Sequence, residues 1–430
     1  MGDKERITRL HAIEILDSRG RPTLQTTCEL ADGTRATVSV PSGASTGSAE
    51  AHELRDDDPT RHGGLGVRNA VANVNGEIER AIVLRRLEPD QMVIDQLLAD
   101  LDGTPNKLRL GANAILSVSL AVARAEARRL GIPLYEHFAN LIGREIGDPV
   151  LPRPTVNLFS GGKHAGGQIP IQDVLITARS AETADEAMAQ ICAVYQRAAD
   201  ICLGRYGMRA LVADEGGLAP NFPSVDAALG DAVQAIQRAG LQPGVDVSLC
   251  IDIAASAFSA GGLYALEGNE LTSGEMIEVI AGWCDSYPII SVEDGLAEDD
   301  WEGWPALNRR LGDHALVVGD DLLATNPARI TRAIETNAAN ALLLKVNQIG
   351  TLTEAAEALR LARSAGWTVI VSARSGETED DWLTDLAIGW GGDQLKVGSV
   401  TRSERLAKWN RLLTVADERG WRLAPWPGRT

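Results

Sequence analysis

Charged side chains recur where apolar runs stop in the second part of the chain. Each run has the length of a buried strand, and the next charged group follows roughly one strand-and-helix unit later. A random scatter of charge would not select the ends of successive runs in this way. The groups are Asp252, Glu293, Asp320, Lys345, Arg374 (with Ser372) and Lys396, which end or follow the runs 246–252, 288–293, 315–319, 340–345, 367–372 and 393–396, respectively.

Three of these groups are carboxylates whose chemistry suits a magnesium ion. Asp252, Glu293 and Asp320 offer hard oxygen ligands and leave coordination positions for water or substrate oxygens. No cysteine or histidine accompanies them at these strand ends, which disfavours zinc. Taken singly, each carboxylate is more often a helix N-cap or a surface charge. As a set, they predict a Mg²⁺ site.

Two lysines add a base to this set. Considered alone, Lys345 is more often a side chain whose stem packs while its head reaches solvent. Across from three carboxylates and beside a second ammonium, Lys396, it becomes a candidate base, because neighbouring positive charges disfavour its protonated form. A proton next to a carboxylate is too weakly acidic for a free side chain, so a metal must stabilise the developing charge. The pattern therefore indicates metal-assisted carbanion chemistry.

Two further stretches offer what such a reaction needs. Asp214-Glu215-Gly216-Gly217 puts Glu215 on a glycine-rich loop, where it is a candidate acid for a leaving hydroxyl group. The segment 372–376 offers the Arg374 guanidinium, the Ser375 hydroxyl and backbone N–H groups, which suit a phosphate. Each stretch alone is also common surface chemistry, so their meaning depends on the strand-end groups.

The elements that must position these groups alternate between strand and helix. Eight strands over roughly 280 residues with helical crossovers predict a β/α barrel, whose strand ends converge on one mouth. The first two strands are joined by the glycine-rich stretch 160–167, which is too short for a helix and predicts an antiparallel start. The predicted strands are 154–159, 171–177, 246–252, 288–293, 315–319, 340–345, 367–372 and 393–396; the predicted helices include 181–204, 225–239, 272–286, 327–336, 352–365 and 402–419.

The first part of the chain has a different pattern. Strand-like segments at 6–14, 23–30 and 34–40 are followed by a helical period over 68–142, with a long alanine-rich helix from Gly111 to about Leu130. Strands followed by helices without alternation predict an α+β domain. We therefore expect an N-terminal α+β cap domain over residues 1–143 and a barrel domain over residues 144–430. Residues 41–47 of the N-terminal domain are all small, and they form either a flexible connector or a mobile loop that approaches a ligand.

Composition excludes several classes of protein. The 430 residues carry a net charge of −18, with 59 acidic against 41 basic residues, which argues against nucleic acid or an anionic membrane as partner. The five cysteines are odd in number and show no C-x-x-C, as expected for reduced thiols in the cytoplasm. The charged N-terminus predicts no signal peptide, and no apolar run is long enough to span a bilayer. We expect a soluble cytoplasmic protein.

An ordered series of short motifs links these features along the chain. The series closely resembles the enolase (phosphopyruvate hydratase) family, nearly end to end. Its members are Leu16-Asp17-Ser18-Arg19-Gly20, Pro41 to Gly47, Gly111 to Ser119, Gly161 to Gly167, Asp214 to Gly217, Glu293-Asp294, Glu298 to Trp301, Gly319 to Leu322, Lys345 to Gly350, Arg374 to Asp380 and Arg402 to Arg405.

The resemblance implies an enolase-type barrel with the order β-β-α-α at its start, capped by the α+β domain. It implies two Mg²⁺ ions: one held by Asp252, Glu293 and Asp320, and a second that bridges Ser45 and the substrate phosphate. It further implies that Lys345 takes the C2 proton of 2-phosphoglycerate, that Lys396 holds the carboxylate and that Glu215 assists loss of the C3 hydroxyl. His164, Gln172, Arg374 and Ser375 match positions that line the substrate, and family members are usually homodimers or larger.

Several positions depart from the family pattern. Ala373 stands where a histidine is expected, and Asp173 is a catalytic-position carboxylate shortened by one methylene. Ala257, Gly295 and Ala49 are further departures. Displacing a reacting group by about 1 Å can cost on the order of 100-fold in rate, so the first two bear on activity.

These departures leave three hypotheses. The first is an enzyme diverged toward forming carboxyphosphonoenolpyruvate, because losing the imidazole would leave room for a substituent on phosphorus. The second is an ordinary phosphopyruvate hydratase that tolerates both changes. The third is a non-catalytic binding protein that keeps the fold. In the first two cases the ligand is a small phosphorylated or phosphonylated carboxylic acid.

Overall fold

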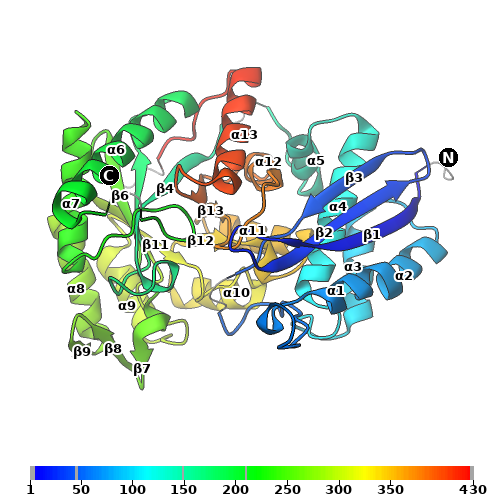
Figure 1. Cartoon of the computed structure of the whole chain (residues 1–430), viewed down its shortest axis with the longest axis horizontal. Helices are drawn as coiled ribbons and strands as arrows, with labels where there is room; N and C mark the ends of the chain where they lie inside the picture. Colours follow the sequence, from blue (N-terminus) through cyan, green and yellow to red (C-terminus); the bar gives the residue numbers. More distant parts are fainter. Residues whose placement is uncertain (1–4, 44–46, 148–149, 209–210, 427–430) are drawn as a thin grey trace.

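The computed structural model describes residues 5–43, 47–147, 150–208 and 211–426. Figure 1 shows two parts, a smaller blue and cyan N-terminal part and a larger barrel that runs from green to red. Of the predicted loop 41–47, residues 44–46 lie outside the described residues, and with them Ser45. Among the described residues, no helix is long and apolar enough to cross a membrane.

The N-terminal part is an antiparallel sheet backed by helices, as predicted. The sheet has the order β1 (Ile7–Leu16), β2 (Pro22–Leu30) and β3 (Arg35–Ser39). The main helix, α4 (Ala112–Leu130), has 14 of its 19 residues buried, because small alanine side chains allow close packing on all sides. It ends at Gly131, whose left-handed φ of 68° stops the helix as the sequence predicts. The remaining helices are α1 (Arg68–Asn73), α2 (Glu79–Leu84), α3 (Gln91–Asp102) and α5 (Leu134–Leu141), with a π-helical turn at Val74–Ile78.

The second part is a closed barrel of eight strands, which confirms the predicted fold class. The second barrel strand pairs antiparallel with both of its neighbours, and the remaining pairs are parallel. The irregular start therefore follows from the short glycine-rich connection. Around the barrel the strands are β4 (Arg153–Ser160), β5 (Asp173–Ala178), β6 (Val247–Asp252), β10 (Ile289–Glu293), β11 (Leu316–Gly319), β12 (Ala341–Leu344), β13 (Thr368–Ser372) and β14 (Gln394–Gly398).

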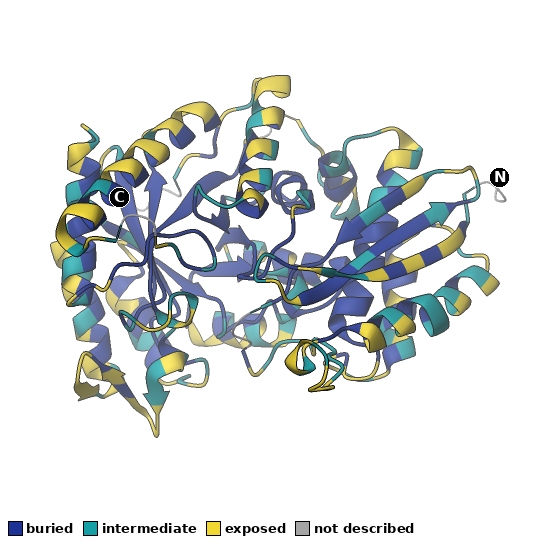
Figure 2. Cartoon of the chain, viewed as in Figure 1, coloured by how far each residue is buried: buried dark blue, intermediate teal, exposed yellow. Residues whose placement is uncertain are grey.

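Helices surround the barrel and cover its strands, which Figure 2 shows as a buried centre with exposed outer helix faces. Two helices follow β5 before β6 begins, so the order at the start is β-β-α-α. Two helices, α9 (Gly303–Leu311) and α12 (Trp382–Gly389), were not named from the sequence. The small sheet of β7 (Ser259–Ala260), β8 (Leu263–Leu266) and β9 (Asn269–Leu271) was not named either. The barrel helices are α6 (Ala184–Tyr206), α7 (Val225–Arg238), α8 (Ser273–Ser286), α9 (Gly303–Leu311), α10 (Pro327–Thr336), α11 (Leu352–Ser364), α12 (Trp382–Gly389) and α13 (Ser403–Arg419).

The N-terminal part lies against the carboxyl ends of the barrel strands. Ser42 and Gly376 exchange two backbone hydrogen bonds of 2.7 and 2.9 Å, and the Ser18 N–H donates to the Glu377 carbonyl at 2.8 Å. A side chain at Gly376 would collide with Asp17, since an added Cβ would lie 2.3 Å from its Oδ2 atom. The loop after β13 therefore packs directly against the N-terminal part. The boundary between residues 143 and 144 lies between α5 and β4 and remains a prediction.

The start of α11 also depends on the N-terminal part. The Leu352 N–H donates to Ser119 Oγ at 3.1 Å, and the Thr353 N–H donates to Asp95 Oδ2 at 2.9 Å. Both acceptors lie on cap helices, α4 and α3. Lys107, also from the cap, pairs with Glu354 at 2.5 Å. Helix α11 directly follows the loop that carries Lys345.

Candidate active site

The predicted groups meet at the carboxyl ends of the barrel strands. Asp252 and Glu293 are the last residues of β6 and β10 and lie side by side in register, and Asp320 follows β11. Lys345 follows β12, and Lys396 lies on β14. Each side chain emerges where its strand ends, because parallel strands bring their carboxyl ends to one mouth. The structure therefore brings the predicted strand-end groups together at one mouth, and their roles remain a prediction.

Lys396 joins two of the carboxylates. Its Nζ atom donates to Asp252 Oδ2 at 2.9 Å and to the two Glu293 oxygens at 2.8 and 2.7 Å. Burial works to lower the pKa of Lys396, but the charges of Asp252 and Glu293 outweigh it and raise that pKa well above its usual value. Burial and the nearby Asp252 charge raise the pKa of Glu293 well above normal. Two buried carboxylates thus share one ammonium.

Lys345 forms a second ammonium–carboxylate pair. Its Nζ atom donates to Asp320 Oδ2 at 2.5 Å. Burial and the positive charges of Arg374 and Lys396 work to lower the pKa of Lys345. The Asp320 charge nevertheless raises the pKa of Lys345 above its usual value in this arrangement. The lowered pKa expected for a base is therefore not reached while Asp320 is its partner.

The carboxylates make a crowded oxygen-rich site. Oxygen atoms of Asp294, Asp320 and Asp321 all lie within 4.8 Å of one another. Asp294, at a left-handed φ of 44°, accepts the N–H groups of Asp320 and Asp321 at 2.9 and 2.8 Å. Burial and the Asp320 charge raise the pKa of Asp321 to about 7. A hard divalent cation relieves repulsion among buried carboxylates of this kind, so the site fits Mg²⁺. Asp320 is the predicted metal ligand in this group, whereas the other two predicted ligands, Asp252 and Glu293, pair with Lys396.

The sequence reading assigned no role to Asp294 or Asp321. The signal was present as two acidic doublets, Glu293-Asp294 and Asp320-Asp321, each at the end of a strand. Asp294, Asp320 and Asp321 all line the pocket, and Asp294 also holds the loop after β11 by accepting the backbone N–H groups of Asp320 and Asp321.

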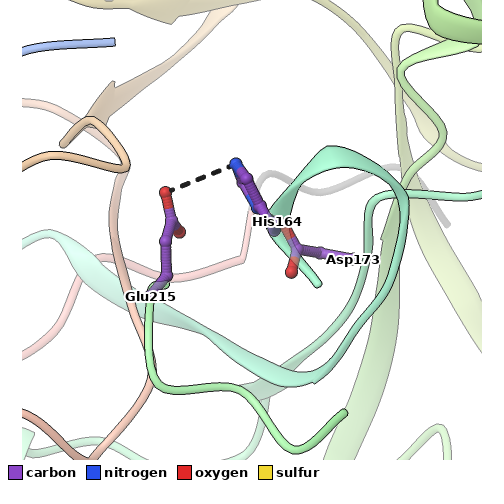
Figure 3. A group of neighbouring side chains, drawn as sticks. All are labelled: His164, Asp173 and Glu215. Carbon is purple, nitrogen blue, oxygen red and sulfur yellow. Dashed lines mark hydrogen bonds and ion pairs between the residues drawn. The ribbon is translucent and has the colours of Figure 1, made fainter. Parts of the chain in front are cut away.

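The other wall of the mouth comes from loops (Figure 3). His164 Nδ1 lies 3.0 Å from Asp173 Oδ2, and His164 Nε2 lies 3.8 Å from Glu215 Oε1, the contact drawn as a dashed line. Burial lowers the pKa of His164, but the two carboxylates outweigh it and raise that pKa to about 9. Burial alone would raise the pKa of Glu215, yet the His164 charge brings it below its usual value. Two carboxylates therefore flank one imidazolium.

Two uncharged side chains fix these carboxylates. Asn157 Nδ2 donates to Glu215 Oε2 at 3.0 Å, and Ser160 Oγ donates to Asp173 Oδ1 at 2.5 Å. Both donors lie on β4 and are fully buried. The shortened carboxylate at position 173 thus has a partner on each oxygen, Ser160 and His164.

The predicted phosphate group, Arg374, is held by an acid from the cap. Its guanidinium pairs with both Glu50 oxygens at 3.0 and 3.1 Å and with Asn347 Oδ1 at 2.9 Å. Ser375 Oγ accepts from Arg19 at 3.3 Å. The sequence reading missed Glu50, although it lies three residues past the predicted mobile loop, because nothing in the sequence shows which strand-end group it would meet.

Both walls face the same pocket. Gln172 also reaches it and donates to Asp252 Oδ2 at 3.1 Å. Asp173 and Glu293 do not line the pocket but pair with residues that do, His164 and Lys396, respectively. The predicted residues that line the pocket are His164, Gln172, Glu215, Asp252, Asp320, Lys345, Arg374, Ser375 and Lys396, and Ala373 lines it with them. Ser45 is the one predicted site residue outside the described part of the chain.

Comparison with known proteins accounts for both parts of the chain. Residues 148–429 match the family model described as "Enolase, C-terminal TIM barrel domain", and residues 7–138 match "Enolase, N-terminal domain". The capped barrel with its acidic mouth is therefore that of a lyase of the enolase superfamily. Enolase 1 of Methylococcus capsulatus is 48% identical over 421 residues, covering 97% of this chain and 98% of that protein. The chain belongs to the enolase family, whose members use Mg²⁺.

Proposed function

We propose that this protein is an ordinary phosphopyruvate hydratase, which converts 2-phosphoglycerate to phosphoenolpyruvate and water. The observation that carries the proposal is that Lys345 and Glu215, from opposite walls, line the same pocket. This arrangement suits removal of a proton from one face of a small substrate and loss of hydroxide from another. The 48% identity to a protein named Enolase 1 supports the same reaction.

Each step uses groups of this chain. Lys345 Nζ takes the C2 proton, and the buried Lys396 ammonium binds the substrate carboxylate. Glu215 in its protonated form, held by Asn157 and facing His164, donates a proton to the C3 hydroxyl group, which leaves as water. Lys345 then releases the C2 proton to solvent and Glu215 regains one from solvent, so the net change is the loss of one water. Arg374 and Ser375 bind the phosphate.

We propose that Asp252, Glu293 and Asp320 hold one Mg²⁺ and that Ser45 serves a second one. When bound, Mg²⁺ supplies positive charge to the substrate carboxylate, whose negative charge grows as the C2 proton leaves. Burial, Arg374 and Lys396 lower the pKa of Lys345, and the charges of Asp320 and Glu293 raise it. A cation held by these carboxylates would offset their charge, so that burial and the two positive neighbours would favour the neutral form of Lys345.

The departures from the family pattern are compatible with the ordinary reaction. Asp173 still has a hydrogen-bond partner on each of its oxygens. Ala373 keeps its backbone place, because its N–H donates to the Lys396 carbonyl at 2.9 Å. The comparisons give no support to divergence toward carboxyphosphonoenolpyruvate, and they favour the alternative reading of an ordinary enolase.

The test is turnover of 2-phosphoglycerate by the purified protein with Mg²⁺, followed by the absorbance of phosphoenolpyruvate. We expect ordinary enolase turnover, and none of a phosphonate analogue. Turnover of the phosphonate analogue alone would overturn the proposal in favour of the diverged enzyme. No turnover of either substrate, together with unchanged biological function of Lys345→Ala, would favour a non-catalytic binding protein.

Assembly and location remain predictions from the resemblance. We expect a homodimer or larger assembly, which sedimentation analysis measures directly. A cytoplasmic location is expected from the sequence and is checked by cell fractionation.

A further inference from the structure

Thr325 and Gln348, which have no part in the proposed reaction, connect the proposed base, Lys345, to Asp320, a proposed metal ligand. Thr325 follows the turn after Asp320, and Gln348 lies in the short helical turn Val346–Gln348 after Lys345. Both side chains are fully buried, each with 0% exposure. Fully buried polar groups are nearly always hydrogen-bonded, so the partners of these two side chains are informative.

The four side chains and one backbone group form a closed ring of hydrogen bonds. Lys345 Nζ donates to Asp320 Oδ2 at 2.5 Å, and Gln348 Nε2 donates to the other oxygen, Oδ1, at 2.9 Å. Thr325 Oγ1 donates to Gln348 Oε1 at 2.8 Å. The ring closes where the backbone N–H of Lys345 donates to Thr325 Oγ1 at 2.9 Å.

The direction of each bond is fixed by simple chemistry. The Lys345 N–H can only donate, so the single Thr325 hydroxyl hydrogen is free to go to Gln348 Oε1. With its oxygen accepting, the Gln348 amide must turn its NH₂ group toward Asp320. This also suits Glu50, whose Oε1 lies 3.4 Å from Gln348 Nε2, because both neighbours of the NH₂ group are then acceptors. The amide therefore has one orientation, and it leaves Asp320 Oδ2 to Lys345.

The backbone of Thr325 departs from ordinary geometry to make this ring. Its φ is 51°, and that of Ala324 is 47°. A left-handed conformation is uncommon for any residue with a Cβ and is a genuine outlier for a β-branched one. Such positions persist where the surroundings hold them, and they cluster at functional sites. Here the turn places the Thr325 hydroxyl directly at the Lys345 N–H.

We propose that Thr325 and Gln348 are positioning residues that set the Lys345 ammonium against the Asp320 carboxylate. Thr325 holds the backbone that carries the base, and Gln348 holds the oxygen of Asp320 that does not face the base. The pair thereby fixes both partners relative to each other before substrate arrives. The catalytic consequence rests on the proposed function, whereas the consequence for Mg²⁺ binding does not.

The test uses near-isosteric variants of the full-length protein. Thr325→Val removes the hydroxyl and keeps the shape, and Thr325→Ser restores the hydroxyl. Gln348→Met removes the amide at similar length. Thr331→Val on α10 and Gln237→Met on α7 are matched controls at exposed positions. The measurements are Mg²⁺ affinity without substrate by calorimetry, and exchange of the C2 proton of 2-phosphoglycerate in D₂O.

We expect Gln348→Met to weaken Mg²⁺ binding several-fold. We expect Thr325→Val to slow C2 exchange by about 10-fold to 100-fold with little change in KM, since misplacing a reacting group by about 1 Å costs rates of this order. Thr325→Ser should recover most of the exchange rate, and both controls should match the parent protein.

Lower thermal stability in Thr325→Val and Gln348→Met, with Mg²⁺ affinity and exchange per folded molecule unchanged, would overturn the proposal. If Gln348→Met does not fold, the comparison of Thr325→Val with Thr325→Ser decides. If the parent protein fails to turn over 2-phosphoglycerate, the proposed function fails, and the Mg²⁺ affinities still decide whether the ring positions Asp320.

Discussion

The two walls of the pocket are built in different ways. The lysine–carboxylate wall stands on the ends of barrel strands, where Asp252 and Glu293 lie side by side in register. The histidine wall stands on the connection from β4 to β5 and on the loop around Glu215, and Asn157 and Ser160 hold it from β4. Of the two departures from the family pattern that bear on activity, Asp173 belongs to the histidine wall, whereas Ala373 directly follows barrel strand β13.

In the proposed reaction the two walls have separate tasks. The strand-end wall would take the proton at C2 and stabilise the charge that follows, which leaves little freedom in the placement of base and ligands. The histidine wall would assist the leaving hydroxyl group, and there the shorter Asp173 carboxylate is held by two hydrogen bonds. We therefore expect substitutions on the two walls to affect different steps.

The largest effect is expected on the strand-end wall. Lys345→Met removes the base and keeps most of the side-chain volume. General base catalysis contributes typically about 100-fold to 10,000-fold, so both C2 exchange and turnover should fall by this order. Proton exchange in D₂O and phosphoenolpyruvate formation measure the two. Turnover within a few-fold of the parent protein would remove Lys345 from the role of base.

A smaller and step-specific effect is expected on the histidine wall. Glu215→Gln keeps the shape but removes the charged carboxylate that faces His164. Turnover should fall by about 100-fold, the lower end for acid–base catalysis, while exchange of the C2 proton persists. The exposed Glu418→Gln is the matched control. Equal loss of exchange and turnover would mean that the two walls do not divide the steps.

The histidine wall should also respond to pH. The pKa of His164 is about 9 when folded and near its usual value of 6.5 when unfolded, so protonation favours the folded state. Its contribution is complete below pH 6.5 and is lost as the pH rises through 9. A pKa shift of this size corresponds to a contribution of about 3 kcal/mol to the free energy of unfolding.

The measurement is the unfolding free energy of the metal-free protein between pH 6 and roughly 9.5, across the interval in which the imidazole titrates. His164→Gln should remove most of the dependence, because the uncharged amide does not titrate. A parent protein whose stability stays flat across this interval would show that His164 is not stabilised as an imidazolium.

The smallest effect is expected from restoring the family glutamate. Asp173→Glu adds a methylene to a fully buried position that already has two hydrogen-bond partners. Overpacking of this kind costs typically about 1–3 kcal/mol, so we expect lower thermal stability and no gain in turnover. Differential scanning calorimetry and turnover with 2-phosphoglycerate test this. A large gain would mean that Asp173 limits the present enzyme.

Sequence reasoning succeeded where chemistry follows a regular element. The strand-end groups could be predicted, because a parallel barrel brings all such ends together whatever the details of packing. The antiparallel start could also be predicted from a connection too short for a helix. Short elements such as α12 (Trp382–Gly389) gave too few turns for a clear period.

The hydrogen bonds and ion pairs that hold the pocket residues in place could not be predicted in this way. Thr325 reaches Lys345 through a left-handed turn, and Glu50 reaches Arg374 from another part of the chain. Neither contact leaves a local pattern, since each depends on how distant segments pack. The raised pKa of Lys345 in the metal-free protein has the same origin: the sequence indicated its neighbours but not how close Asp320 would lie.

Helix α11 gives the division of the chain a different meaning. Its first N–H groups are accepted by Ser119 and Asp95, which belong to the cap. N–H groups without acceptors destabilise the first turn of a helix. The cap supplies two of the acceptors that the first turn of α11 needs. The two parts match separate family models, yet unfolding of the cap would remove two hydrogen-bond acceptors from the first turn of α11, the helix that follows the Lys345 loop.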